Sequence, residues 1–417
     1  MLKAYEYRIF PTPQQEEQFN KTLGLCRLYW NLTLAAKQDD HSYSIKGYHE
    51  TFSKLKPEAL EWIKEVDSVP LTQMWNDVNV AFKNFFSSCN KTRKGKFVKP
   101  PKFKSKKNNK DSFRYSSHPK FVNGDLWISR RLGPIKGAYH CRFAEGSFRN
   151  ITFKRTATGK WFVKICVDKK DENKCHNGKA IGIDWNIHND EMAVLSNGTK
   201  IKSPMFLRRS EKHLAKLQRI MSKRYVRGAE KQSHNYHKAK MRVARLHETV
   251  SWQRKDWLHK LSRELANNYE FVCVENINLQ SMAQMNHGKA VGDQGFGMLR
   301  GMISYKTNLI KVNPAYTSQD CHICGGRNKL LTLSDREWTC PTCGTHLDRD
   351  INAAKNILRK GIELSQNLSK VNLVGAEATE IKNACGGPRS SLKQESFTTS
   401  AGQCPAVSVR ECPRSLV

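Results

Sequence analysis

The stretch CHICGGRNKLLTLSDREWTCPTCGTHLDRDINAAKNIL, residues 321–358, decides the fold of this chain. Its cysteines form two C-x2-C pairs separated by fifteen residues: Cys321, Cys324, Cys340 and Cys343. Two such pairs on facing hairpin turns bring four thiolates into a tetrahedron, so the spacing predicts a zinc ribbon that holds one structural Zn²⁺. Gly325 and Gly344 follow the pairs and suit a tight backbone turn around a metal. We expect the nearby His322 and His346 not to bind it.

Acidic residues stand at comparable places in three parts of the chain. Asp348 and Asp350 directly follow the cysteines and lead into a predicted helix, while Asp184 and Glu275 each end a predicted strand. A lone acid at a strand end is usually a turn or cap residue. Carboxylates are the ligands that Mg²⁺ prefers, and two-metal hydrolysis of a phosphodiester needs several of them around two ions. The pattern is compatible with such a site.

The charge of the chain predicts a polyanionic partner. Its 417 residues carry a formal net charge of +33, far more than solubility requires. No segment approaches eighteen consecutive apolar residues, and the N-terminus has no apolar signal-peptide core, which favours nucleic acid over a membrane. The thirteen cysteines are an odd number without a secretory signal. We therefore expect a reducing cytoplasm, in association with the nucleoid, rather than a disulfide framework.

The N-terminal half alternates between strand and helix patterns. Residues 2–10 are predicted to be a strand, and Thr12 with Pro13 is typical of a helix start. A second helix is predicted over residues 71–88. Short alternating segments with Asn-Gly and Thr-Gly turns follow. We interpret residues 1–10 and 96–178 as a small β-barrel that is interrupted by a helical domain, residues 11–95.

Two groups of polar side chains in this half are candidate nucleic-acid contacts. Residues 91–120 hold twelve Lys or Arg and one Asp, interleaved with aromatic residues, which indicates a loop along a phosphate backbone more than a solvated linker. The candidates there are Lys102, Lys104, Lys106 and Lys107. On the second helix, amides could reach base edges, although such amides are more often just solvated: Gln73, Asn76 and Asn79.

The C-terminal half is predicted to hold one discontinuous unit, residues 179–314 and 346–360, with the cysteine segment 315–345 inserted. Two antiparallel helices broken near Gly228 are expected within it. A glycine-rich stretch, residues 286–297, is flexible enough in composition to be an active-site lid. Residues 361–417 are poor in hydrophobic periodicity, and we expect most of them to be disordered.

Several of these segments together resemble the TnpB (OrfB) family, transposon-encoded nucleases of bacterial insertion sequences that are related to type V CRISPR effectors. The resemblance covers about residues 1–390, and the cysteine segment together with the acidic motif after it is highly specific. The matching motifs are GID at 182–184, VEN at 274–276, YTSQDCHICGG at 316–326, LTLSDREWTCPTCG at 331–344 and DRDINAAKNIL at 348–358.

This resemblance implies an α/β multidomain protein. It implies a RuvC nuclease domain of RNase H-like fold (residues 179–314 and 346–360) and a zinc-ribbon insert that binds target nucleic acid. The β-barrel would be the wedge domain and residues 11–95 the recognition domain. Position by position, the family's metal-binding carboxylates fall on three residues that would hold two Mg²⁺ ions: Asp184, Glu275 and Asp350.

The resemblance also implies partners and an activity. They are a guide RNA from the transposon end and double-stranded target DNA, which would be cut next to a short transposon-adjacent motif. We expect a monomer on the RNA in a prokaryotic cell, without a membrane partner. The chain departs from the family after Asp184, where Trp185 and Asn186 replace a small or apolar residue followed by Gly. The alternatives are a nuclease-inactive RNA-guided DNA-binding protein and an accessory transposase.

Overall fold

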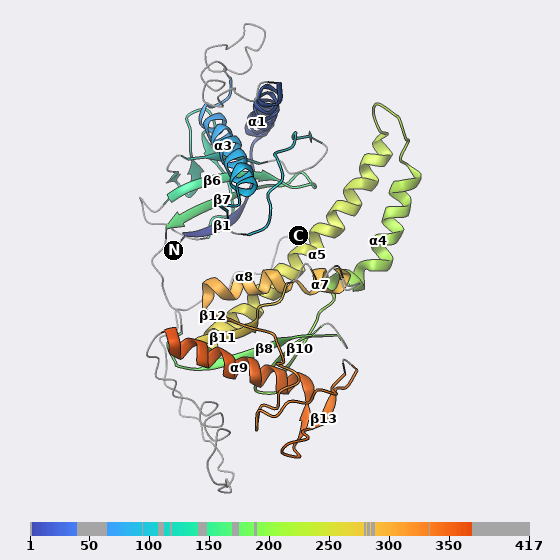
Figure 1. The fold of residues 1–417 in the computed structure, drawn as a ribbon. Helices are drawn as coiled ribbons and strands as arrows, with labels where there is room; N and C mark the ends of the chain where they lie inside the picture. The colour runs from blue at the N-terminus through green and yellow to red at the C-terminus, as the bar shows by residue number, and fades with distance from the viewer. Residues whose placement is uncertain are drawn as a thin grey trace.

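The chain folds into an N-terminal and a C-terminal lobe, joined through a long helix that rises between them (Figure 1). The computed structural model describes residues 2–39, 65–93, 95–106, 112–116, 119–140, 148–168, 175–186, 190–278, 281, 284, 288–332 and 334–368. None of the helices in these ranges is long and apolar enough to cross a membrane.

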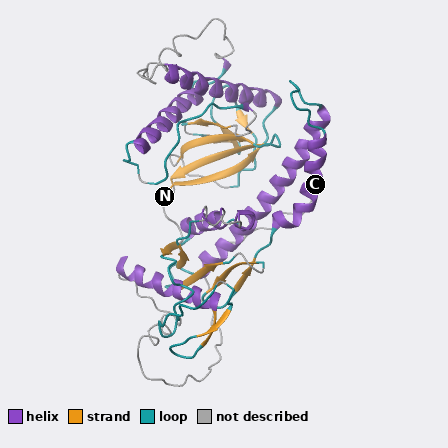
Figure 2. Ribbon diagram, turned by 45° about the vertical axis from the view of Figure 1, so that its right-hand side comes forward, coloured by secondary structure: helices purple, strands orange, loops and turns teal. Residues whose placement is uncertain are grey.

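The N-terminal lobe consists of two helices over antiparallel sheet (Figure 2). A four-stranded sheet has the order β1-β7-β6-β2, and a three-stranded sheet has the order β3-β4-β5. The elements are β1 (Leu2–Ile9), α1 (Pro13–Asp39), α3 (Val69–Cys89), β2 (Ser112–Tyr115), β3 (Lys120–Val122), β4 (Asp125–Trp127), β5 (Pro134–Ile135), β6 (Phe148–Arg155) and β7 (Trp161–Asp168).

Aromatic residues form the core of this lobe. Phe19 of α1 packs on Phe153 and Trp161, with ring centroids 5.0 and 4.9 Å away. The helix begins as the sequence predicts, because Thr12 and Gln15 form reciprocal bonds: the Gln15 amide donates to Thr12 Oγ1 and the Thr12 amide donates to Gln15 Oε1. Alternate residues of β7 are buried, as expected for a strand with one face on a core.

The described strands of this lobe form two sheets instead of the closed β-barrel that the sequence pattern suggests. Strands β3, β4 and β5 have only two or three residues each and pair with one another. Their segment meets the larger sheet at an isolated bridge between Ile9 and Gly137. A pattern of short alternating segments predicts strands, but it does not say which edges pair, and closure depends on those pairings.

The C-terminal lobe is built on a mixed five-stranded sheet of order β10-β9-β8-β11-β12. Strand β8 runs parallel to β11 and antiparallel to β9, and β11 runs parallel to β12. The elements are β8 (Ala180–Trp185), β9 (Glu191–Leu195), β10 (Lys200–Lys202), α4 (Phe206–Lys223), α5 (His234–Asn268), β11 (Phe271–Glu275), α7 (Gly288–Gln294), α8 (Phe296–Lys306), β12 (Asn308–Val312), β13 (Glu337–Thr339), β14 (His346–Asp348) and α9 (Arg349–Leu368).

Helices cover both faces of this sheet, which explains why its central strands are apolar throughout. On one face, Ile183 and Val274 lie in a core with Leu258 of α5 and Leu299 of α8. On the other face α9 lies against β8 and β11. A Cβ on Gly182 would stand 2.1 Å from the carbonyl oxygen of Ala354, so only glycine allows this close approach.

The two helices predicted for residues 206–268 are confirmed as α4 and α5, a hairpin whose turn includes Gly228 at φ +81°. The glycine-rich stretch is different from the expected loop, because residues 288–294 form α7 and α8 begins at Phe296. Val291 and Phe296 are buried in the core, and this packing makes a helix favourable despite the glycines.

The predicted start of a disordered tail at residue 361 also needs correction. Helix α9 continues through Gly361 to Leu368, since Gly361 lies directly on Cys273 of β11. A Cβ at Gly361 would stand 2.2 Å from the Cys273 Sγ atom. Residues 369–417 lie outside the described residues.

Candidate functional site

A polar cavity of about 330 Å³ collects carboxylates from three separate elements. Asp184 comes from the end of β8, Glu275 from the end of β11 and Asp350 from the first turn of α9. The register pairs Ile183 with Val274, so the next residues along the two parallel strands, Asp184 and Glu275, are neighbours at one edge of the sheet. The structure thus brings together the three acidic residues that the sequence singled out.

Asp348 has a different place from Asp350. Its Oδ1 atom accepts hydrogen bonds from the backbone amides of Asp350 (2.9 Å) and Ile351 (3.0 Å), the geometry of a helix N-cap. Its Oδ2 atom lies 3.4 Å from Lys200 Nζ. Asp348 is not among the residues that line the cavity, so its carboxylate holds the start of α9.

Burial and mutual repulsion shape the electrostatics of the cavity. Burial, followed by the charges of Glu275 and Asp350, raises the pKa of Asp184 well above its ordinary value, although Arg349 partly offsets this. Burial also raises the pKa of Glu275, against the opposing effects of a hydrogen bond from Thr317 and the charge of Lys360. The site therefore favours neutral acids or a bound cation.

Polar side chains around the carboxylates hold their orientation. The Thr317 hydroxyl donates to Glu275 Oε1 at 2.6 Å. The Asn186 amide donates to Asp350 Oδ2 at 3.1 Å, and Arg336 Nη1 lies 3.5 Å from the same oxygen. Trp185 is buried against Phe296. Both residues that depart from the family pattern, Trp185 and Asn186, line the cavity.

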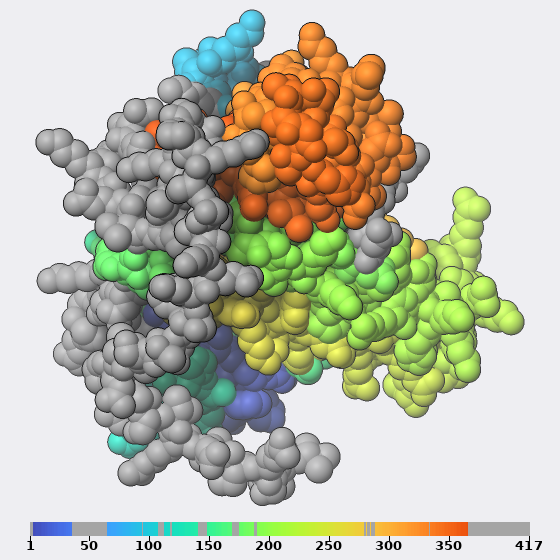
Figure 3. Space-filling model, turned by 90° about the horizontal axis from the view of Figure 1, so that it is seen from below, coloured from blue at the N-terminus to red at the C-terminus, as the bar shows by residue number. Residues whose placement is uncertain are grey.

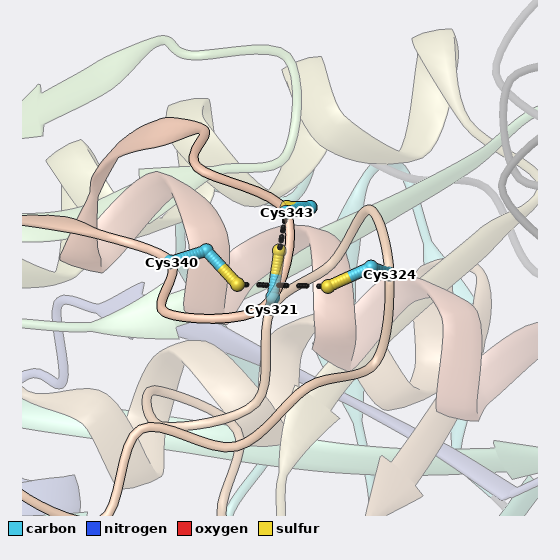
Figure 4. Close-up of side chains that lie close together, drawn as sticks. All are labelled: Cys321, Cys324, Cys340 and Cys343. Atoms are coloured by element: carbon cyan, nitrogen blue, oxygen red, sulfur yellow. Dashed lines mark hydrogen bonds between the residues drawn. The ribbon is translucent and has the colours of Figure 1, made fainter.

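The four predicted cysteines form one cluster, and their sulfur atoms all lie within 4.8 Å of one another (Figure 4). The cluster could hold a metal ion. Each C-x2-C pair closes a turn in which a glycine amide donates 2.9 Å to the carbonyl of the first cysteine, with Gly325 at φ +74° and Gly344 at φ +72°. The expected role of both glycines is confirmed. No histidine belongs to this cluster in the described part of the chain.

Two buried asparagines of α9 form hydrogen bonds to the cysteine segment and the residues before it, and these bonds hold the segment against that helix. Asn352 Oδ1 accepts from the backbone amide of His322 at 2.9 Å, and its Nδ2 donates to the Asp320 carbonyl at 2.8 Å. Asn356 donates to the carbonyls of Thr317 (2.9 Å) and Asp320 (2.6 Å). In the space-filling view from below, the orange atoms of the cysteine segment and α9 lie together on one side of the molecule (Figure 3).

The candidate nucleic-acid contacts lie in the N-terminal lobe. The Lys104 ammonium lies 3.8 Å from the ring centroid of Trp30 and 3.2 Å from Met74 Sδ, so it packs against the protein itself. Lys102, Lys104 and Lys106 are all exposed, and Lys104 differs in its side-chain contacts with Trp30 and Met74. Lys107 lies outside the described residues. The three predicted base-reading amides are partly exposed on α3: Gln73, Asn76 and Asn79.

Sequence reasoning missed five polar residues of the cavity: Asn186, Thr317, Ser318, Arg336 and Arg349. Asn186 was noticed only as a departure from a pattern. Thr317 and Arg336 stand within the quoted motifs, but nothing in their spacing says that they meet carboxylates far away in the chain. Asn186, Thr317, Ser318 and Arg349 each stand next to another cavity residue in the sequence, whereas Arg336 has no such neighbour.

Family models match three parts of this chain. The OrfB_IS605 model, described as "Probable transposase", matches residues 164–286. The "Cas12f1-like, TNB domain" model matches residues 296–357, which include the cysteine cluster and Asp350. A model described as "Helix-turn-helix domain" matches residues 1–46. In the described part of that range, a single strand precedes a single helix.

Relatives of known name align over most of the chain. A protein of Streptomyces pristinaespiralis, named "Putative RNA-guided DNA endonuclease", is 32% identical and covers 96% of this chain and 98% of its own. "Putative RNA-guided DNA endonuclease InsQ" of Escherichia coli strain K12 is 29% identical over 86% of this chain and 92% of its own.

A solved structure also aligns over most of the chain, at 9% identity and a TM-score of 0.47: "Structure of the mini-RNA-guided endonuclease CRISPR-Cas_phi3". It covers 87% of this chain and 92% of that one.

The fold, the site and the sequence matches together describe a protein with a carboxylate cavity and a four-cysteine cluster that matches a probable-transposase family model. The alignment with the Streptomyces protein runs nearly end to end at 32% identity. The chain belongs to the OrfB (TnpB) family.

Proposed function

We propose that this protein is an RNA-guided DNA endonuclease of an insertion-sequence transposon. It cuts DNA next to a short transposon-adjacent motif by two-metal phosphodiester hydrolysis. The observation that carries this proposal is the convergence of Asp184, Glu275 and Asp350 on one cavity, from three elements far apart in sequence. The names of the relatives support the same function. The mixed sheet that presents these acids is the RuvC-like nuclease domain that the family resemblance implies.

The three carboxylates of the cavity supply the oxygen ligands that divalent cations prefer. Hard carboxylate oxygens suit Mg²⁺. Burial, followed by the charges of Glu275 and Asp350, raises the pKa of Asp184, so a bound cation would stabilise its ionised form. Asp184, Glu275 and Asp350 would hold two Mg²⁺, which would supply an activated water and stabilise the leaving oxygen. Arg336, 3.5 Å from Asp350, would face the phosphate charge.

The cysteine cluster fits Zn²⁺, because four thiolate sulfurs within 4.8 Å suit a closed tetrahedral site. Zinc would hold the insert that carries Arg336. Its asparagine contacts with α9 would transmit that position to Asp350. The ion would thus have a structural role, whereas hydrolysis would depend on magnesium.

The partners would be a guide RNA derived from the transposon end and double-stranded target DNA. A net charge of +33 matches a long polyanion, and binding should weaken steeply with salt. Lys102 and Lys106 would contact phosphates, and Lys107 belongs to the same basic segment. The amides on α3 would read the adjacent motif. We place this protein, as a monomer on its RNA, at the nucleoid in the cytoplasm of a prokaryotic cell.

Cleavage by carboxylate variants tests this function. Wild type and the variants Asp184→Ala, Glu275→Ala and Asp350→Ala are purified with their RNA and given a matched target and Mg²⁺. Each variant should bind the target and fail to cut it, and combined variants should lose no more, because the three acids act as a unit. Asp256→Ala, at an exposed acid paired with Lys260 on α5, is the matched control and should cut normally. A wild type that binds its target without cutting would favour the nuclease-inactive DNA-binding alternative.

A further inference from the structure

Tyr316 stands beside the carboxylate cavity in an unusual backbone conformation. It lies between Pro314 and Thr317, which both line the cavity, and Thr317 also binds Glu275. Its φ is +62°, a left-handed conformation that a bulky side chain rarely adopts, and the residue is 52% exposed. Such strain persists only where surrounding contacts impose it, and it occurs preferentially at functional sites.

A guanidinium supports the ring. The Cζ atom of Arg327 lies 3.6 Å from the Tyr316 ring centroid, which is a close cation–π stack. The same guanidinium forms two hydrogen bonds to the Asp320 carboxylate, from Nε at 2.6 Å and from Nη2 at 3.3 Å. The Asp320 backbone amide in turn donates to the Tyr316 carbonyl at 3.0 Å. The three residues form a closed set of contacts that orients the exposed ring.

The position of this ring relative to the cavity is also set. The Asp320 carbonyl accepts hydrogen bonds from Asn352 and Asn356 of α9, the helix that begins beside Asp350. Thr317, the next residue after Tyr316, donates to Glu275 on β11. The ring is therefore tied through short chains of contacts to two of the three carboxylates.

Packing alone does not account for Tyr316. A structural tyrosine is usually buried, whereas about half of this residue remains accessible. Exposed tyrosines are common, and Tyr225 in the α4–α5 turn is one, 53% exposed, but it packs on Tyr236 and has no cavity residue beside it in the sequence. Tyr316 differs because strain, a cation partner and a neighbouring carboxylate site occur together.

We propose that Tyr316, backed by Arg327, is a stacking platform for a base of the single-stranded DNA segment that enters the carboxylate cavity. Aromatic side chains bind single strands through base stacking, which tolerates any base sequence, and arginine adds a cation–π contribution. A guided nuclease must accept any target sequence, so a stacking contact suits it better than readout of base edges. Tyr316 is then a positioning residue for the scissile strand. This role rests on the proposed nuclease function.

Photocrosslinking tests the platform without requiring cleavage. The Asp184→Ala protein with its co-purified RNA is bound to targets that carry 5-iodouracil at successive positions of one DNA strand, then irradiated. A crosslink should form at one or two adjacent positions and map to Tyr316 by mass spectrometry. Tyr316→Phe should keep it because the ring remains, and Tyr316→Ala should lose it. Crosslinking at Tyr316 from iodouracil in the RNA alone would overturn the assignment to DNA.

Single-turnover cleavage supplies the second measurement. Tyr316→Ala should cut roughly tenfold more slowly, the effect of losing about one stacked base. Tyr316→Phe should cut at nearly the wild-type rate. Arg327→Lys should resemble Arg327→Ala, because lysine cannot replace the planar bidentate group. Tyr225→Ala is the matched control. Equal rates for wild type and Tyr316→Ala, without a crosslink at Tyr316, would refute the platform. If wild type never cuts but the crosslink forms, the nuclease function fails and the platform stands.

Discussion

The Oδ1 atom of Asp348 accepts a hydrogen bond from the backbone amide of Asp350 at 2.9 Å. Two acids that are two residues apart thus have separate tasks: one caps α9, and the other points its carboxylate to the cavity. Both acids directly follow the cysteine segment, and their spacing alone does not say which of them would bind a metal ion. The hydrogen bonds separate them, and they also suggest how each should respond to substitution.

We predict that Asp348→Ala lowers the free energy of unfolding by about 0.5–2 kcal/mol, the usual effect of losing an N-cap. Asp348→Asn and Asp348→Ser should restore most of this stability, because both side chains cap helices well. Asp350→Ala should instead leave stability nearly unchanged and slow cleavage by roughly three orders of magnitude or more, since several kcal/mol of transition-state stabilisation would be lost. Urea unfolding and single-turnover cleavage on the same samples check both. Loss of cutting in Asp348→Asn with intact stability would contradict the assignment.

Zinc should depend on the cysteines and not on the neighbouring histidine. Cys340→Ser should lose the bound zinc and unfold the local ribbon, because structural zinc contributes folding free energy directly. His322→Ala should keep one zinc per chain, since His322 bonds to Asn352 of α9. Elemental analysis of the purified proteins measures this, and a full zinc equivalent in Cys340→Ser would show that the ligand set is wrong. Cleavage should also slow in Cys340→Ser, because Arg336 is carried by the same segment.

Substitutions of the lysines in the basic segment should have two different effects, one on nucleic-acid binding and the other on protein stability. Neutralising Lys102 and Lys106 together should weaken nucleic-acid binding and reduce the slope of log affinity against log salt by about one per lost phosphate contact. Lys104→Ala should mainly lower stability, because its ammonium packs on the Trp30 ring. The backbone hydrogen bonds of residue 104 to Asn31 should remain in this variant. Binding titrations at several salt concentrations, with thermal unfolding of each variant, distinguish the groups. An unchanged slope in the double variant would argue against this contact surface.

The cysteine segment could be predicted from sequence because its ligands are local: two short spacings and two glycines specify both turns. The meeting of Asp184, Glu275 and Asp350 was reached through family motifs, since the residues between them carry no information on register. The register that pairs Ile183 with Val274 arises from the packing of apolar strands on two helical layers.

Predictions from composition alone were less reliable. Residues 288–294 and 296–297 contain glycines and still form helix, because tertiary burial outweighs a propensity cost of about 1 kcal/mol per glycine. For a related reason, the sequence pattern does not determine whether the strands of the N-terminal half close into the expected barrel. Strand pairing at sheet edges depends on contacts between distant segments, which alternation along one strand does not encode.

The metal-free carboxylate site should make stability depend on pH. Folding raises the pKa of Asp184, so its stabilising contribution is present below the unfolded pKa and is lost as the pH rises through the folded pKa. Asp184→Asn removes this titration. In EDTA, the melting temperature of Asp184→Asn relative to wild type should therefore increase from acidic to neutral pH, by roughly 2–4 °C for each kcal/mol. Saturating Mg²⁺ should reverse the difference, because only wild type keeps the full ligand set. Calorimetric scans across pH, with and without Mg²⁺, measure the difference in melting temperature between the variant and wild type. A difference that does not change with pH would contradict the raised pKa of Asp184.

Gly182 should be irreplaceable because α9 rests on it. A Cβ at this position would stand 2.1 Å from the Ala354 carbonyl oxygen and 2.8 Å from the Leu358 backbone nitrogen, and backbone atoms of a packed helix cannot move aside cheaply. Gly182→Ala should therefore cost about 1–3 kcal/mol of stability, as overpacking usually does, and should displace α9 with Asp350 from Asp184. Cleavage should fall more steeply than Mg²⁺-independent target binding, since the phosphate contacts lie elsewhere.

Gly24→Ala is the matched control: the added methyl meets nothing within 4 Å and lies within α1, where alanine is the better helix former. It should raise stability slightly and leave cleavage unchanged. Normal cleavage and stability in Gly182→Ala would mean that the contact between α9 and β8 does not set the geometry of the carboxylates.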